Sequence, residues 1–123
     1  MTTLTIGGSL PNLNEYTKAN RTNMHVGANM KKQTETMITS FIQQQLHGVE
    51  TIERCTIRFV WVEKDRRRDL DNIAFAKKFI LDALVKNGIL KGDGWSCVTG
   101  FSDSFRVDKE RPRIEVYIEE EKE

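Results

Sequence analysis

Acidic and basic residues gather in one stretch of the chain, KDRRRDLDNIAFAKKFILDALVKNGILKGDGW at residues 64–95. Two aspartates, Asp69 and Asp71, are separated by one residue, and a third, Asp93, lies in a Gly-Asp-Gly turn. Three arginines come directly before the pair: Arg66, Arg67 and Arg68. Carboxylates bind hard divalent cations, and the planar guanidinium fork matches phosphate oxygens. The stretch therefore predicts a metal site beside a phosphate-binding site.

The spacing of the two aspartates sets a condition on the backbone. Residues two apart on an α-helix point about 200° away from each other, so Asp69 and Asp71 converge on one ion only if Asp69 is still extended where a helix begins. Lys78 follows Asp71 by seven residues, which returns it to nearly the same helix face, whereas Lys77 points away from that face. Lys78 is therefore the lysine that we expect beside the acidic pair.

The helix that starts at or just after Asp69 must end before the chain reaches the third aspartate. Asn87-Gly88 is a usual helix stop, so we expect a helix of roughly four turns up to this point. Glycines on both sides of Asp93 permit a tight turn there. The chain is thus expected to bring this third carboxylate back toward the acidic pair.

These motifs resemble the signature of the RusA family of Holliday junction resolvases. The resemblance is carried by RRRDLDNI at residues 66–73, by the KxxxDAL pattern at residues 78–84 and by the aspartate that follows the helix stop. LPNLNEY at residues 10–16 is similar to the Pro- and Asn-rich segment of the family, and the C-terminal strand pair is comparable. The resemblance thus extends over most of the chain.

The resemblance implies a homodimeric endonuclease that depends on Mg2+, with Mn2+ able to substitute, and that cuts four-way DNA junctions symmetrically. By position, Asp69 and Asp71 match the two carboxylates of the DLDN motif, and Asp93 matches the third metal-binding aspartate. Lys78 matches the lysine of the catalytic site. The three arginines before the motif are then candidates for DNA binding. No Ser/His/Asp or Cys/His set is visible, which disfavours covalent catalysis.

The chain departs from the family pattern at two places. Between Asp71 and Asp82 it is longer, so counting forward from Asp71 places the catalytic lysine on Phe75, whereas counting back from Asp82 gives Lys78. The helix face expected to be shared with Asp71 favours Lys78. The family often has two adjacent acids before its final strands, and Gly92 replaces the first of them. A single acidic candidate therefore remains at that place.

The overall composition is that of an ordinary globular domain. The chain has 123 residues, of which 38% are hydrophobic and 30% charged, so we predict one domain over residues 1–123. The formal net charge is only +1, so a DNA-binding surface must be a local patch. There is no apolar run of membrane-spanning length and no signal-peptide core. We expect no membrane partner and a cytoplasmic location, and the resemblance implies a bacterial or phage source.

The cysteines do not indicate a metal centre. Cys55 and Cys97 form no CxxC pair, and His25 and His47 are the only histidines, so a zinc site is disfavoured. Each cysteine falls within a predicted strand, where a small buried thiol is the simplest interpretation.

The polar segment at residues 11–29 contains five asparagines, which we interpret as turn markers. We therefore predict a long loop after a first strand within residues 1–9. Asn14, Lys18 and Arg21 are candidates for contact with the DNA backbone, because long loops in small domains often bind ligands. Two alternatives stay open: the loop is only solvated, or Tyr16 anchors it to the core.

The remaining pattern predicts the fold class. Apolar residues at helical spacing predict a core-facing helix at residues 30–46, with Asn29 as its N-cap. Strands are predicted at residues 52–62, 95–106 and 113–119. The order β, α, β, α, β, β predicts an α/β fold with two layers, a small mixed sheet of about four strands and two helices, as the RusA resemblance also implies.

Simpler explanations exist for each part of the site. Either aspartate alone would serve as an ordinary helix N-cap, and the arginines or Lys78 would serve as solvated surface charges. Asp82 is expected to form an ion pair with Lys78 or Lys86. Three other functions also stay open: a branched-DNA binding protein of the same fold with a weakened site, a Mg2+-dependent nucleotide phosphohydrolase, and an interaction protein with a structural ion. The last lacks the acidic loop of an EF-hand.

Overall fold

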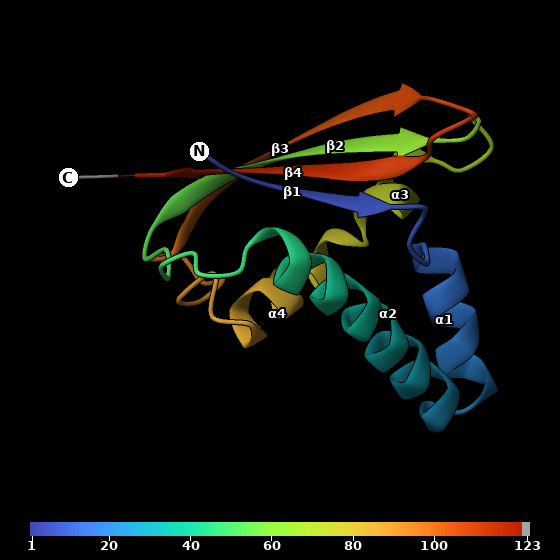
Figure 1. Cartoon of the computed structure of the whole chain (residues 1–123). Helices are drawn as coiled ribbons and strands as arrows, with labels where there is room; N and C mark the ends of the chain where they lie inside the picture. Colours follow the sequence, from blue (N-terminus) through green and yellow to red (C-terminus); the bar gives the residue numbers. More distant parts are fainter. Residues whose placement is uncertain (122–123) are drawn as a thin grey trace.

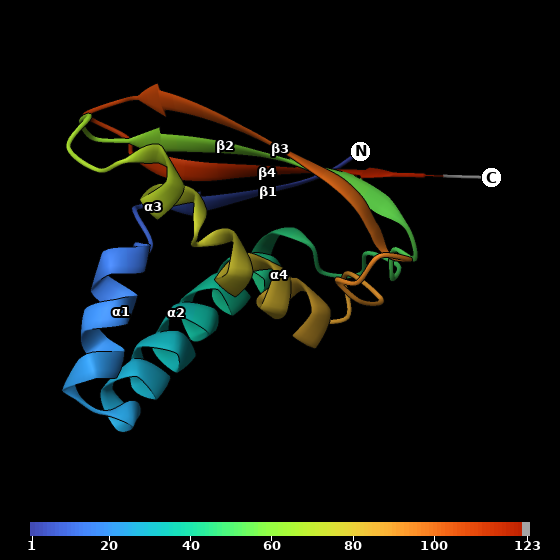
Figure 2. The same ribbon diagram turned by 180° about the vertical axis from the view of Figure 1, so that it is seen from behind.

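The computed structural model describes residues 1–121 and shows a helical layer packed on one face of a four-stranded sheet (Figure 1). The strands lie in the order β1-β4-β2-β3. Their bounds are Thr2–Gly7 for β1, Cys55–Glu63 for β2, Val98–Val107 for β3 and Arg113–Glu120 for β4. Seen from behind, the helices again lie on one side of the sheet (Figure 2). The predicted two-layer α/β fold with a mixed sheet is confirmed.

Strand β2 is the central element of the sheet. It pairs in parallel with β3 and antiparallel with β4, which in turn pairs antiparallel with β1. Parallel neighbours require a crossover that passes over one face of the sheet. Here the crossover contains α3 (Leu70–Ala74) and α4 (Lys77–Lys86). The charged stretch at residues 64–95 therefore lies on the connection between β2 and β3. It starts after the C-terminal end of β2 and finishes before the N-terminal end of β3, at opposite ends of these two parallel strands.

Alternating side chains of the two inner strands, β2 and β4, form the core. On β2 the residues that face the helices are Cys55, Ile57, Phe59 and Trp61, and all four are buried. Strand β4 contributes Ile114, Val116 and Ile118 to the same core. The helices cover this surface with Ile38, Ile42, Phe79, Ile80 and Leu84. The sheet and helices are thus joined by one hydrophobic core.

The predicted loop at residues 11–29 is wrong, because this segment is mostly helical. Helix α1 spans Leu13–Thr22, and α2 spans Met24–Gln45 rather than residues 30–46. Asn12 and Asn23 are the N-caps, and their side chains accept hydrogen bonds from Glu15 N and Val26 N, each at 2.9 Å. Asparagine favours both turns and helix N-caps. The residues that we interpreted as turn markers therefore start two helices, and Asn29 lies inside the second.

The predicted single helix after Asp69 is also wrong, because it is broken at Phe75 and Ala76. Ala76 N bonds to Ile73 O, and Phe79 N bonds to Ala76 O, which are tight turns of three residues that separate α3 from α4. No proline or glycine marks the break. Lys78 would share a face with Asp71 only on a continuous helix, so the break removes this reason for choosing Lys78. The predicted stop is confirmed, since α4 ends at its C-cap Asn87.

Aromatic contacts hold the broken helix against the N-terminal helix. The Phe75 and Phe79 rings lie 5.6 Å apart at 89°, and the Tyr16 ring of α1 lies 5.6 Å from Phe75 and 5.5 Å from Phe79. Such edge and tilted arrangements are favourable for aromatic pairs. Tyr16 therefore anchors the N-terminal segment to the core, which was one of the two alternatives to a DNA-binding loop.

The two cysteines differ in their surroundings. Cys55 is fully buried on β2, as predicted, whereas Cys97 is half-buried in the turn before β3 and not in a strand. Both are free thiols.

Within residues 1–121, no helix has the length and apolar character needed to cross a bilayer.

The buried thiol gives a prediction that depends on pH. Burial, together with the negative charges of Glu120, Glu121 and an ionised Cys97, raises the pKa of Cys55 to about 11. An unfolded cysteine has a pKa of about 8.5. We expect a thiol-specific reagent at pH 8 to label Cys97 rapidly and Cys55 slowly, because the thiolate is the reactive form. Labelling of Cys55 should accelerate as the pH approaches 11.

The same pKa shift affects stability. The free energy of unfolding is unaffected by this group below about pH 8.5, where the thiol is neutral in both the folded and the unfolded state. Between about pH 8.5 and 11 the unfolded state loses the proton first, so the free energy of unfolding decreases as the pH rises.

The labelling experiment has two controls. The variant Cys97→Ser isolates Cys55 for labelling, and wild type in urea is the control for full reactivity. Rapid labelling of Cys55 in the folded protein at pH 8 would contradict the assignment.

Candidate functional site

The two closely spaced aspartates lie where the chain leaves β2 and enters α3. Asp69 is the N-cap with φ −70° and ψ 148°, so it is extended, which is the condition that the spacing requires. Its side chain makes no capping hydrogen bond. Asp71, in the first turn, accepts a hydrogen bond from Asn72 N at 3.0 Å. Both side chains are exposed, and among residues 1–121 neither takes part in an ion pair. These carboxylates are thus free to bind a ligand.

The third aspartate lies beside Lys78 instead. Lys78 Nζ is 4.0 Å from Asp93 Oδ2 and 3.2 Å from Asp82 Oδ1, while Lys31 of α2 lies 3.7 Å from Asp82 Oδ2. The hydrogen bond to Asp82 and the charges of Asp82 and Asp93 raise the pKa of Lys78. The expected ion pair of Asp82 with Lys78 is confirmed, and Lys86 instead contacts Glu35 at 2.6 Å. The structure therefore brings Lys78 and Asp93 together.

The three aspartates do not form a ready-made site. In the part of the chain that the structure describes, no three His, Cys, Asp or Glu side chains are grouped so that they could hold one ion. The parallel crossover explains this, because Asp69 follows the end of β2 whereas Asp93 precedes the start of β3. Mg2+ is commonly bound through one or two carboxylates and keeps several waters. The exposed pair Asp69 and Asp71 fits that requirement by itself.

The three arginines have different surroundings. Arg68 is only 22% exposed: its Nη1 lies 3.2 Å from Glu63 Oε1, and its Nη2 donates to Leu10 O at 2.9 Å. It therefore ties the loop to the segment before α1. Arg67 is 88% exposed and lies 3.6 Å from Asp65. Arg66 is exposed, and its side chain forms no hydrogen bond or ion pair within residues 1–121. Arg66 and Arg67 are the two arginines available to phosphate groups.

The other predicted DNA contacts lie on a helix rather than a loop. Asn14, Lys18 and Arg21 belong to α1 and are exposed. Their spacings of four and three residues place them on one face of that helix. The structure thus turns three scattered candidates into one polar stripe on α1.

A charged contact between α4 and β3 was missed in the sequence. Lys77 Nζ lies 2.7 Å from Asp103 Oδ2, and Trp61 Nε1 donates to Asp103 Oδ1 at 2.8 Å. The same ammonium lies 4.8 Å from the centre of the Phe101 ring. Lys77 therefore fixes α4 against the sheet. Only the strand register, which the sequence does not specify, brings Asp103 next to Trp61.

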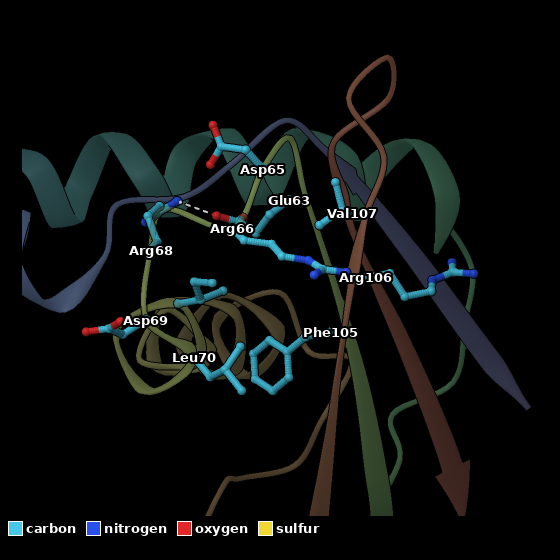
Figure 3. Close-up of a pocket in the computed structure, with 10 residues that line it drawn as sticks. Glu63, Asp65, Arg66, Arg68, Asp69, Leu70, Phe105, Arg106 and Val107 are labelled. Carbon is cyan, nitrogen blue, oxygen red and sulfur yellow. Dashed lines mark hydrogen bonds and ion pairs between the residues drawn. The ribbon is translucent and has the colours of Figure 1, made fainter.

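A cavity of about 410 Å3 opens beside the acidic pair, between the 63–70 segment and the end of β3 (Figure 3). Its apolar wall is formed by Leu70, Ile73, Phe105 and Val107, and its polar rim includes Glu63, Arg66, Arg68 and Asp69. No local sequence pattern connects these residues. One residue could have indicated the cavity: Leu70 is an apolar residue between two aspartates in the sequence. In the structure it is 56% exposed.

Comparison with known proteins identifies the family. The family model described as Endodeoxyribonuclease RusA matches residues 11–119. The comparison with curated proteins finds no match. The matched range begins before α1 and ends within β4, so it includes the β2–β3 crossover with all four candidate catalytic residues. The chain therefore belongs to the RusA family of Holliday junction resolvases and is an endodeoxyribonuclease, an enzyme whose family acts on branched DNA and generally depends on a metal ion.

Proposed function

We propose that this endonuclease resolves four-way DNA junctions in recombination and repair by Mg2+-dependent hydrolysis of two symmetric phosphodiester bonds. The observation that supports this most is the pair of free carboxylates, Asp69 and Asp71, which follow the exposed Arg66 and Arg67 with only Arg68 between them. A metal-binding pair beside a phosphate-binding pair is the arrangement that phosphodiester hydrolysis requires.

Asp69 and Asp71 would supply the protein ligands of the ion, with Mn2+ able to substitute. When bound there, Mg2+ would lower the pKa of a water and neutralise negative charge on the phosphate oxygens. The extended backbone of Asp69 aims its carboxylate independently of the helix that carries Asp71. Asp93 is the third carboxylate that the family resemblance implies, and Lys78, which contacts it, is the proposed catalytic-site lysine.

Basic side chains would hold the DNA next to these carboxylates. Arg66 and Arg67 reach solvent from the loop before the acidic pair, and the α1 stripe adds Lys18 and Arg21. Phosphate contacts of this kind supply affinity without reading the sequence. Selectivity for a junction would come from two active sites held at a fixed distance and orientation. A four-way junction has approximate two-fold symmetry, so we propose a homodimer that presents one site to each of two opposing strands.

The different surroundings of the arginines give a testable prediction. Replacing Arg66 or Arg67 by Gln should weaken junction binding and reduce the slope of log affinity against log salt by about 0.9 for each phosphate that the variant no longer neutralises. Stability should change little, because both side chains are exposed. Arg68→Gln should instead lower the free energy of unfolding by about 2 kcal/mol, since Glu63 loses its partner.

Fluorescence anisotropy across a salt series, combined with urea unfolding, measures both effects. A loss of stability in the Arg66→Gln or Arg67→Gln variant would show that these side chains are structural. An unchanged salt slope would show that they do not contact phosphate.

The proposed function is tested by incubating the protein with a synthetic four-way junction or with linear duplexes of the same sequence. Each strand is labelled in turn, and Mg2+ is compared with EDTA. We expect nicks at symmetric positions in two opposing strands of the junction, only with the metal ion. Equal cutting of the linear duplex would contradict selectivity for the junction.

A second candidate is a junction-binding protein of the same fold with weakened catalysis. Two observations favour it. Among residues 1–121 no three carboxylates are grouped, and Gly92 stands where the family resemblance implies an acid. Binding of the junction without cutting, in Mg2+ and in Mn2+, would select this candidate.

A further inference from the structure

We propose that the cavity beside Asp69 binds one unstacked nucleobase of the DNA, next to the phosphodiester bond that is cut. This inference rests on the proposed function, because it assigns the neighbouring carboxylates to the cleaved phosphate. It adds a specific contact with a base to a site otherwise built for phosphate groups.

The wall of the cavity is apolar and open to solvent. Leu70 is 56% exposed and Val107 is 47% exposed, and Phe105, partly buried, lies between them and the core. In Figure 3 the Leu70 side chain and the Phe105 ring point toward each other below the opening. Apolar side chains exposed together around one hollow commonly mark a binding site. A flat apolar ligand would cover them.

The rim of the cavity is polar and carries both charges: Glu63, Asp65 and Asp69 are acidic, and Arg66, Arg68 and Arg106 are basic. In Figure 3, the Arg66 side chain extends across the top of the hollow toward β3, and a dashed line joins Arg68 to Glu63. Arg66 has no protein partner within residues 1–121, so its guanidinium is free to bind the backbone phosphate of a nucleotide or to stack on a base. An apolar wall with the unpaired Arg66 guanidinium at its rim fits a nucleobase with its phosphate.

The size and place of the cavity agree with this ligand. Its volume of about 410 Å3 lies within the usual range for small-ligand sites. The register pairs Glu63 with Val107 and Trp61 with Phe105, which brings the end of β3 next to the loop that leads to Asp69. Asp69 lines the cavity, and its carboxylate points away from the apolar wall in Figure 3. A base in the cavity would thus lie beside the phosphate at the carboxylates.

The test measures binding in EDTA, so that it does not depend on cleavage. Four-way junctions are prepared with a single abasic nucleotide at each position around the crossover, and their affinity is compared for wild type and Leu70→Ala. Leu13→Ala is the matched control, because Leu13 is also an exposed leucine at the first position of a helix and does not line the cavity.

For wild type and Leu13→Ala, we expect an abasic nucleotide to weaken binding about tenfold at one position in each of two opposing strands, as expected for loss of one stacked base. Leu70→Ala should bind the intact junction about tenfold more weakly and should show no further loss with the abasic nucleotide. Equal affinity of wild type for every abasic junction, while the intact junction is cut in Mg2+, would overturn the inference and leave the proposed function in place.

Two further outcomes separate the proposals. In the first, the abasic nucleotide weakens binding of wild type but not of Leu70→Ala, and no metal ion supports cutting. This result would support base binding in the cavity but contradict the endonuclease mechanism. A free nucleotide offers the same chemistry, so the four deoxynucleoside monophosphates are titrated without DNA. Saturable binding of one of them, together with no effect of abasic nucleotides, would assign the cavity to a free nucleotide and overturn the inference.

Discussion

Replacing Asp71 by Asn is expected to reduce junction cleavage at least about 100-fold while the junction is still bound. Loss of residues that only orient metal ligands typically costs 10- to 100-fold, so loss of the proposed direct ligand should cost more. Asparagine keeps the size of the side chain and one oxygen but removes the charge that would hold the proposed ion. Because Asp71 is exposed and outside any ion pair within residues 1–121, the fold should be unaffected.

Glu50→Gln is the control for removing one negative charge. Glu50 is exposed and precedes β2, whereas Asp71 follows it, so the length of a nine-residue strand separates the two positions along the sheet. Rates of junction cleavage at saturating protein, with affinity measured separately in EDTA, give both quantities. Wild-type cleavage by Asp71→Asn would remove this residue from the catalytic site.

Replacing Phe79 by Ala is expected to lower the free energy of unfolding by about 3–5 kcal/mol. Phe79 is 1% exposed, and its ring contacts both Tyr16 and Phe75. The substitution leaves a cavity where α1, the helix break and α4 meet. A domain of this kind has a total stability of about 5–15 kcal/mol, so much of it would be lost. Urea unfolding followed by circular dichroism measures the change.

Phe101→Ala is the matched control for this substitution. Phe101 is 49% exposed on β3, where its ring lies 4.8 Å from the Lys77 ammonium. Its loss should cost about 1 kcal/mol or less, which is typical of an exposed aromatic residue with one cation contact. Equal destabilisation by the two substitutions would show that the aromatic cluster is not a central part of the core.

Much of the fold is local in origin and could be predicted from the sequence. The alternation of Ile114, Val116 and Ile118 identifies the buried face of β4, and Asn87-Gly88 marks the end of α4. The extended backbone at Asp69 also follows from local spacing. Each of these features depends on a few consecutive residues, which is why the sequence was sufficient.

Other features depend on contacts between distant segments. The break at Phe75 carries no proline or glycine, and its aromatic partner Tyr16 lies on α1, far away in the sequence. The break also moves Lys78 away from a shared helix with Asp71. Asparagine at positions 12 and 23 served equally well as a turn or a cap signal, so α1 was missed.

The candidate site was predicted in parts. Free carboxylates at Asp69 and Asp71 and exposed arginines beside them follow from the motif. The position of Asp93 does not follow from the motif, because the parallel pairing of β2 with β3 places it at the opposite end of these strands from Asp69. The cavity wall likewise needs the β3 register, which sets Phe105 opposite Trp61. Long-range pairing of strands is not determined by any short pattern.

The most direct measurement uses a supercoiled plasmid that extrudes one cruciform. A first nick releases the supercoiling and removes the junction, so a linear product forms only if the second strand is cut while the protein is still bound. With Mg2+, we predict linear plasmid broken symmetrically at the cruciform, and none with Asp71→Asn. Accumulation of nicked circles without linear product, or equal cutting of a plasmid without the cruciform, would contradict paired cleavage by two sites.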